Sequence, residues 1–88
     1  MNKVMRKELD ALLSLLGSID LEHIGQTLTD LQQEEQDKFD NLSEGLQASD
    51  KGLAIEDAAN NLQEAIDYLE EAQAALEEAV TAIEGAKE

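Results

Sequence analysis

The amino-acid sequence predicts an all-α protein, an antiparallel, coiled-coil-like helical hairpin with a short N-terminal third helix. Three observations lead to this prediction. Aliphatic residues recur at intervals of three and four along most of the 88 residues, which is the period of amphipathic helices. The chain has no proline, so nothing interrupts these patterns except a few glycines and polar turn formers. The length suits one helical domain, residues 1–88.

The first predicted helix covers residues 3–16. One of its faces is apolar, and the residues on that face are Met5, Leu9, Leu12 and Leu16, with Leu13 and Leu15 beside them. Gly17 and Ser18 supply a natural break before the next helix.

The second predicted helix covers residues 20–40, and Ser18 or Asp20 is expected to cap its start. One residue in its apolar series is out of character, the acid at position 35. The series is Leu21, Ile24, Leu28, Leu31, Glu35 and Phe39. A connection follows at residues 41–52, and its length favours antiparallel neighbours. Within it, Leu42 and Leu46 are expected to close the end of the hairpin, together with Phe39.

The third predicted helix is the longest, about residues 53–86, and Ser49 or Asp50 is expected to cap it. It repeats a pattern of one large aliphatic residue, two polar residues and alanine five times. The copies begin at Ile55, Leu62, Leu69, Leu76 and Ile83. A seven-residue period places every copy on nearly the same face, because two helical turns take 7.2 residues. Gln73 interrupts the apolar stripe, and it either fixes the register of packing or lies at the edge of the stripe in water.

The long helix exceeds each of its neighbours in length, so we expect part of its stripe to remain uncovered and to support a homodimer. The chain has few aromatic residues and a thin core, for which association is a common remedy. The residues expected to mediate self-association are Leu62, Ala65, Leu69, Ala72, Leu76, Ala79 and Ile83.

The charge is strongly negative and uneven. The chain has 21 acids and six bases, a net charge of −15. Residues 18–88 hold 19 of the acids and three of the bases, a net of −16, whereas residues 1–17 are slightly basic. A surface of this kind repels nucleic acid and anionic membranes and attracts a protein partner with a basic surface.

Patterns that indicate chemistry are missing from the sequence. Without cysteine there is no disulfide framework, Cys-type zinc site or thiol nucleophile. The single histidine, His23, follows Asp20 at the spacing of half a di-iron motif, but such sites need that motif twice. Residues 40–51 have the glycine of a calcium loop, but Leu42 and Lys51 stand where oxygen ligands are needed. We therefore expect no enzyme and no catalytic, metal or cofactor site.

The sequence also favours a cytoplasmic location, since no apolar run approaches the roughly 20 residues that span a bilayer. The basic start followed by Leu12 to Leu16 is too short and too interrupted by acids for a signal peptide.

The acids form clusters beside the aliphatic column, roughly one for every two turns of the long helix. A rod striped in this way can imitate the phosphate backbone of a nucleic-acid duplex and occupy the groove of a protein that binds one. The residues expected to contact a partner are Glu70, Glu71, Glu77, Glu78, Glu34, Glu35 and Asp37. The alternative interpretation is that these acids only keep a small helical protein soluble.

One segment resembles a known group of proteins. The run Glu34 to Gln47, EEQDKFDNLSEGLQ, followed by Ser49 to Gly52 and the Ala-rich acidic helix, is similar to small acidic helical proteins of phages and prophages. The resemblance covers roughly residues 20–84 and is most specific from Phe39 to Gln47. It implies a phage context, in the cytoplasm of a host cell, and no particular activity.

Many phage proteins of this size and acidity bind and disable host enzymes, including defence nucleases. The expected function is therefore that of a non-enzymatic interaction protein that inhibits a defence or nucleic-acid enzyme. The alternative is a self-associating structural or assembly protein.

Overall fold

The computed structural model describes residues 1–87 as a rod of helices, with extents of 68 × 15 × 14 Å for the chain. The helices are α1 (Lys3–Gly17), α2 (Leu21–Asp40), α3 (Glu44–Gln47) and α4 (Asp50–Ala86). No strand occurs in this part of the chain, which confirms the all-α prediction.

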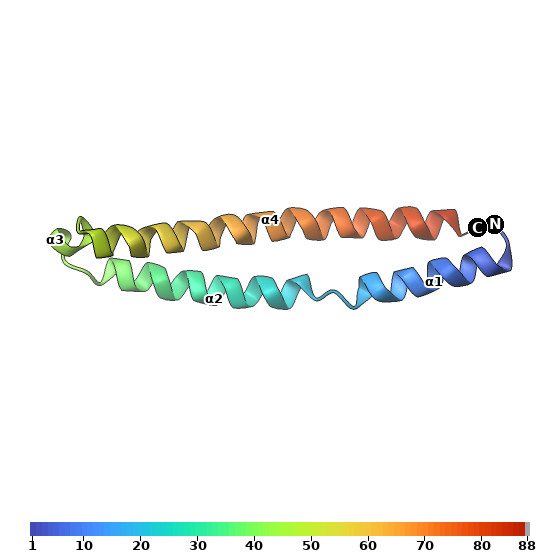
Figure 1. Cartoon of the computed structure of the whole chain (residues 1–88), viewed down its shortest axis with the longest axis horizontal. Helices are drawn as coiled ribbons and strands as arrows, with labels where there is room; N and C mark the ends of the chain where they lie inside the picture. Colours follow the sequence, from blue (N-terminus) through green and yellow to red (C-terminus); the bar gives the residue numbers. More distant parts are fainter. Residues whose placement is uncertain (88) are drawn as a thin grey trace.

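The rod has two arms, α4 on one side and α1 followed by α2 on the other (Figure 1). Both ends of the chain lie at one end of the rod and α3 at the other. Near the chain ends, the Arg6 Nε–H donates to the Lys87 carbonyl oxygen at 2.9 Å, and the Lys87 ammonium pairs with Asp10. The expectation that part of the long helix lacks a neighbour is therefore wrong, because α1 continues the arm that α2 begins.

Side-chain oxygens determine where the helices start. The Asp20 carboxylate accepts a hydrogen bond from the His23 backbone N–H at 2.9 Å, and the Ser49 hydroxyl accepts one from the Gly52 N–H at 3.2 Å. Of the capping residues predicted in pairs, the structure thus uses Asp20 and Ser49. Ser18 instead donates its hydroxyl to the Leu15 carbonyl at the end of α1. The Asp20–His23 spacing is explained by the cap.

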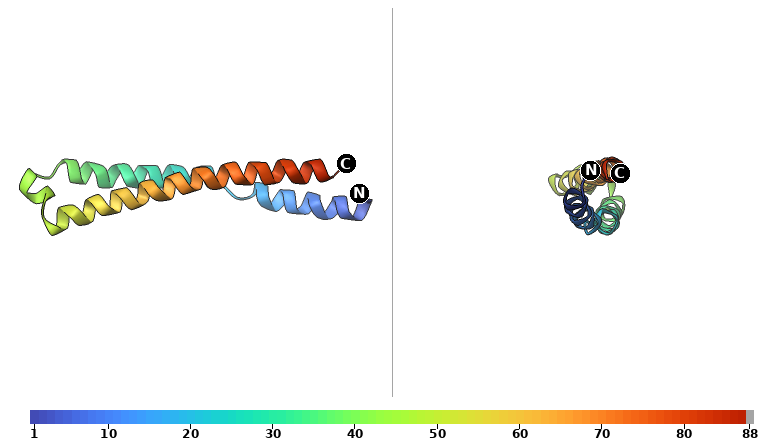
Figure 2. Two further views of the ribbon diagram at one scale, coloured as in Figure 1. Left: turned by 90° about the horizontal axis from the view of Figure 1, so that it is seen from above. Right: turned by 90° about the vertical axis from the view of Figure 1, so that its right-hand side faces the viewer.

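The packing between the arms follows one column of residues on α4, which we call the contact column. Ala59 and Ile66 are its buried hydrophobic members. The half-buried aliphatic members are Ile55, Leu62, Leu69, Leu76, Val80 and Ile83. The alternation of three- and four-residue steps matches the seven-residue repeat and keeps one face toward a neighbouring helix along its whole length. α4 crosses the other arm at a shallow angle, as this period requires (Figure 2).

The matching column on α2 differs in part from the predicted one. Its half-buried members are Leu21, Gly25, Leu28, Gln32, Glu35 and Phe39. Ile24 and Leu31, predicted for this face, are 46% and 44% exposed. Each comes one residue before a contact position and so lies about 100° away from it around the helix. A single partner helix covers one column, and the apolar stripe of α2 is wider than that.

The turn between the arms contains the short helix α3 and the residues on either side of it. The Gln47 side-chain amide donates to the Phe39 carbonyl oxygen at 3.1 Å, which ties α3 to the end of α2. Phe39 and Leu42 are half-buried, as predicted, but Leu46 is 54% exposed, so its predicted place in the core is wrong. The unpredicted helix α3 turns this side chain outward, while the Leu46 backbone contacts the start of α4.

Gly52 is the residue that permits this contact. A Cβ atom at this position would overlap the carbonyl oxygens of Leu46 and Gln47, which are backbone atoms and cannot rotate away. The start of α4 therefore needs glycine for close approach, although glycine is a poor helix former.

We expect Gly52→Ala to lower the free energy of unfolding by about 1–3 kcal/mol, the usual cost of overpacking, despite alanine's higher helix propensity. Gly25→Ala is the matched control, since a Cβ atom there meets nothing within 4 Å. This control should gain up to about 1 kcal/mol. Urea unfolding followed by circular dichroism measures the free energy of unfolding of both variants. Equal effects of the two substitutions would contradict the conclusion that Gly52 is needed for close approach of the backbone.

A candidate protein-binding groove

A continuous groove runs along one side of the two arms. It consists of two hollows of about 390 and 490 Å³ that share Leu21, Glu22 and Gln73. Aliphatic residues from all three long helices lie in it, namely Leu13, Leu16, Leu21, Ile66, Leu69, Leu76 and Val80. We call it the acidic groove, because six acids and no base line it. These are Asp20, Glu22, Asp30, Glu70, Glu77 and Glu84.

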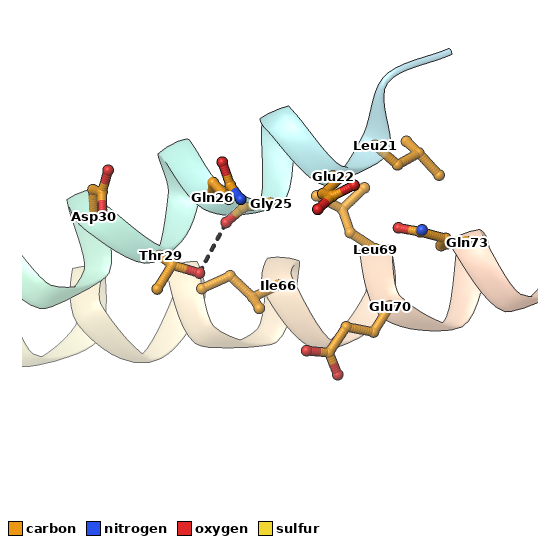
Figure 3. A pocket seen from close by; sticks show the side chains of 10 residues that line it. All are labelled: Leu21, Glu22, Gly25, Gln26, Thr29, Asp30, Ile66, Leu69, Glu70 and Gln73. Atoms are coloured by element: carbon orange, nitrogen blue, oxygen red, sulfur yellow. Dashed lines mark hydrogen bonds between the residues drawn. The ribbon is translucent and has the colours of Figure 1, made fainter. Parts of the chain in front are cut away.

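The two hollows of the groove meet near the break in the two-helix arm, where they share Leu21, Glu22 and Gln73. Between α1 and α2 the chain leaves helical geometry at residues 18–20, and Ile19 and Asp20 of this break line one hollow together with Gln73 and Leu76 of α4. Gln73 stands at this place in the contact column, and it is exposed and lines both hollows. Gln73 faces the other arm and is exposed, which fits the interpretation that it lies at the edge of the stripe in water (Figure 3). That it fixes the register of packing stays a prediction.

Most groove acids take no part in the polar contacts within the chain. Elsewhere on the rod, glutamine side chains donate to the acid four residues on, at 2.9–3.1 Å. The pairs are Gln33–Asp37, Gln36–Asp40 and Gln63–Asp67. Among residues 1–87, no side-chain hydrogen bond or ion pair involves the carboxylates of Glu22, Asp30, Glu70, Glu77 or Glu84. These five carboxylates remain available to an external cation.

The structure divides the acids predicted to contact a partner. Glu70 and Glu77 lie on the groove, and Figure 3 shows the Glu70 carboxylate directed away from α2. Glu71 is exposed on α4, and Glu78 borders a separate shallow hollow on that helix, next to Glu77. The acids predicted on α2 lie outside the groove.

Of these α2 acids, Glu34 and Asp37 are exposed, whereas Glu35 is half-buried on the face toward α4. Glu35 pairs with Lys38 at 2.9 Å, and this hydrogen bond and the carboxylate charge raise the pKa of Lys38 above its usual 10.5. The small stabilisation from this exposed pair is present at neutral pH and is lost as the pH rises through the raised pKa. Glu35 is thus engaged within the chain.

The residues predicted for self-association are divided as well. The aliphatic members Leu62, Leu69, Leu76 and Ile83 belong to the contact column. Ala72 and Ala79 are exposed, while Ala65 is half-buried.

Four groove acids were absent from the predicted set, namely Asp20, Glu22, Asp30 and Glu84. A regularity in the sequence could have found two of them. Many residues of the groove directly follow an aliphatic residue of a contact column. They are Glu22, Thr29, Glu70, Glu77 and Glu84. A residue one step after such a position lies on one fixed side of the pair of arms.

The structure also places the single histidine and the potential metal ligands of the described residues. His23 is exposed, and its backbone takes part in the α2 cap. Within residues 1–87, no three His, Cys, Asp or Glu side chains gather closely enough to hold a metal ion. None of the helices in this range combines the length and the apolar character needed to cross a bilayer.

Comparisons of the chain with protein-family models, with curated proteins and with solved structures found no match.

We expect the groove acids to be unnecessary for folding. Replacing Glu70 and Glu77 together by glutamine should leave the melting temperature unchanged or raise it by a few degrees, because each substitution reduces repulsion in a chain of net charge −15. Added sodium chloride screens the same repulsion, so it should stabilise the wild type, and it should stabilise the double variant less. Thermal melts at several salt concentrations measure this, and a large loss of stability in the variant would show that these acids serve the fold.

Proposed function

We propose that this chain is a non-enzymatic interaction protein, built as an antiparallel, coiled-coil-like hairpin, that binds a basic protein partner through the acidic groove. The close packing of α2 beside α4 and the contact between Arg6 and Lys87 support the hairpin. The aliphatic lining of the groove between unpaired carboxylates supports the binding role.

The composition of the groove indicates the kind of surface it suits. Aliphatic side chains at its base gain free energy when another apolar surface covers them. Carboxylates along its edges attract lysine and arginine and steer a basic protein toward it. A helix with an apolar stripe flanked by basic residues satisfies both requirements, because such a helix can continue the packing of the two arms.

We further propose that the partner is a nucleic-acid enzyme of a host or phage, and that the chain inhibits it by imitating nucleic acid. Glu70, Glu77 and Glu84 recur every two turns, about 10.5 Å apart along α4, and so present a regular row of negative charge. Basic grooves that bind a phosphate backbone attract such a row. If residues 20–84 come from a phage protein, as we expect from their sequence, the chain inhibits a defence enzyme in the host cytoplasm.

A second candidate function is that of a self-associating structural or assembly protein with an acidic surface that only keeps it soluble. The thin core favours it, since Ala59 and Ile66 are the only hydrophobic residues buried among those that the structure describes. The two functions differ in whether the position of the acids matters.

Two variants with equal charge separate these functions. The groove variant replaces Glu22, Glu70, Glu77 and Glu84 by glutamine. The control variant replaces exposed acids outside the groove by their amides, namely Glu34, Asp57, Glu64 and Glu71. Each loses four negative charges, so long-range attraction falls equally in both, and only the groove variant loses local contacts.

Immobilised wild-type protein should retain a nucleic-acid enzyme from a bacterial lysate, and duplex DNA or raised salt should release it. The groove variant should bind the identified enzyme about tenfold or more weakly than the control variant does. Capture that resists salt and DNA, or equal weakening by the two variants, would reject the proposal.

A further inference from the structure

The two arms present two chemically different sides. Residues that directly follow contact positions line the acidic groove, such as Glu22 after Leu21 and Glu70 after Leu69. Residues that directly precede contact positions lie on the opposite side, because one residue turns a helix by about 100°. This opposite side, which we call the apolar side, contains Ile24 before Gly25 and Ala72 before Gln73.

The α1–α2 arm supplies one half of the apolar side, in which large aliphatic residues stand among a few charged ones, namely Glu8 before Leu9, Glu34 before Glu35 and Lys38 before Phe39. Met5 and Leu12 on α1 stand seven residues apart, as do Ile24 and Leu31 on α2. All four are 44–49% exposed, and Leu15 beside them is 64% exposed. The rod thus leaves a large part of each of these side chains in contact with water, although burial would favour all of them.

The α4 arm supplies the other half of the apolar side with small residues. A second column with alternating steps of three and four residues runs beside the contact column and holds no charged residue. Its members are Ala65, Tyr68, Ala72, Ala75, Ala79, Ala82 and Ala86. Tyr68 is 68% exposed, and the alanines from Ala72 onward are exposed. Alanine lets another helix approach closely, so this arm can receive large side chains.

The accessible surface of the chain exceeds that of a compact protein. It is 6442 Å² for 9.6 kDa, whereas the general relation between mass and surface gives about 5,100 Å² for this mass. The excess is larger than the roughly 800 Å² that each partner buries in a stable complex of standard size. A second copy can therefore cover this much surface while the packing between the two arms stays intact.

We propose that two copies of this chain associate through their apolar sides as a symmetric four-helix dimer. In a two-fold arrangement each copy uses the same surface. The α1–α2 arm of one copy then lies on the α4 arm of the other, so that Ile24 and Leu31 pack among the alanines. Two molecules of net charge −15 can approach each other only through an uncharged surface, and the apolar side of α4 provides one.

This inference goes beyond the proposed function, because it concerns the side opposite the acidic groove. In the dimer both grooves face outward and each remains free for a partner. Of the residues predicted to mediate self-association, the dimer then uses the alanines Ala65, Ala72 and Ala79, while the aliphatic ones pack within each copy.

Analytical ultracentrifugation of three variants tests the dimer. The first variant, Ile24→Glu with Leu31→Glu, changes large side chains on the α1–α2 arm. The second, Ala72→Glu with Ala79→Glu, changes alanines on the α4 arm. The control, Gln26→Glu with Thr29→Glu, adds the same charge to α2 on the groove side. We expect the wild type and the control to sediment at twice 9.6 kDa and the other two variants at 9.6 kDa with unchanged helix content. A monomeric wild type, or dimers in all three variants, would overturn the proposal.

The single tyrosine provides a second measurement that needs no substitution. Tyr68 lies on the apolar side and belongs to the proposed interface, so acrylamide should quench its fluorescence weakly in concentrated wild-type protein and strongly after dilution. Quenching as efficient as that of free tyrosine at every concentration would overturn the proposal even if the variants failed to fold.

Discussion

The packing of one column of α4 against α2 and α1 is the interaction on which the rest of the structure depends. No disulfide can support this chain, and its only buried hydrophobic residues within the described range are Ala59 and Ile66. The remaining contact positions are half-buried aliphatic residues spread along a rod 68 Å long. Each of these residues contributes modestly to the free energy of folding, and the stability comes from the repetition of the contact along the whole of α4.

The seven-residue repeat also determines what the surface displays. Once the contact column is fixed, every other position of the repeat has a fixed direction around the helix. The acids that follow the column therefore gather on one side, and the alanines that precede it gather on the other. A single repeating pattern thus specifies the core, the acidic groove and the apolar side. The accumulation of like charge in the groove opposes folding, which favours a role in binding for these acids.

Much of this architecture could be predicted from the sequence, and the exceptions have physical causes. The periodicity indicated all three long helices and nearly their full extents. The choice between adjacent aliphatic columns on α2 depends on the register of packing, which the pattern of one helix does not contain, so Ile24 and Leu31 were placed on the wrong face. Helix α3 was missed because a four-residue helix has no periodicity, and its place depends on Gly52 and on the hydrogen bond from Gln47. The candidate site was predicted in part, because Glu70 and Glu77 belong to the repeat, whereas Asp20, Glu22 and Asp30 come to the groove from the other arm.

The most direct test of this account is the distance between spin labels placed on opposite arms. The chain has no cysteine, so Lys7→Cys and Gly85→Cys give a unique pair on α1 and the end of α4. Labelled protein diluted into excess unlabelled protein should show a distance below about 20 Å, the separation of packed helices plus two label arms. A long or broad distribution would contradict the packing of α4 along the other arm. A short distance that disappears on dilution would show that α4 packs against a different molecule.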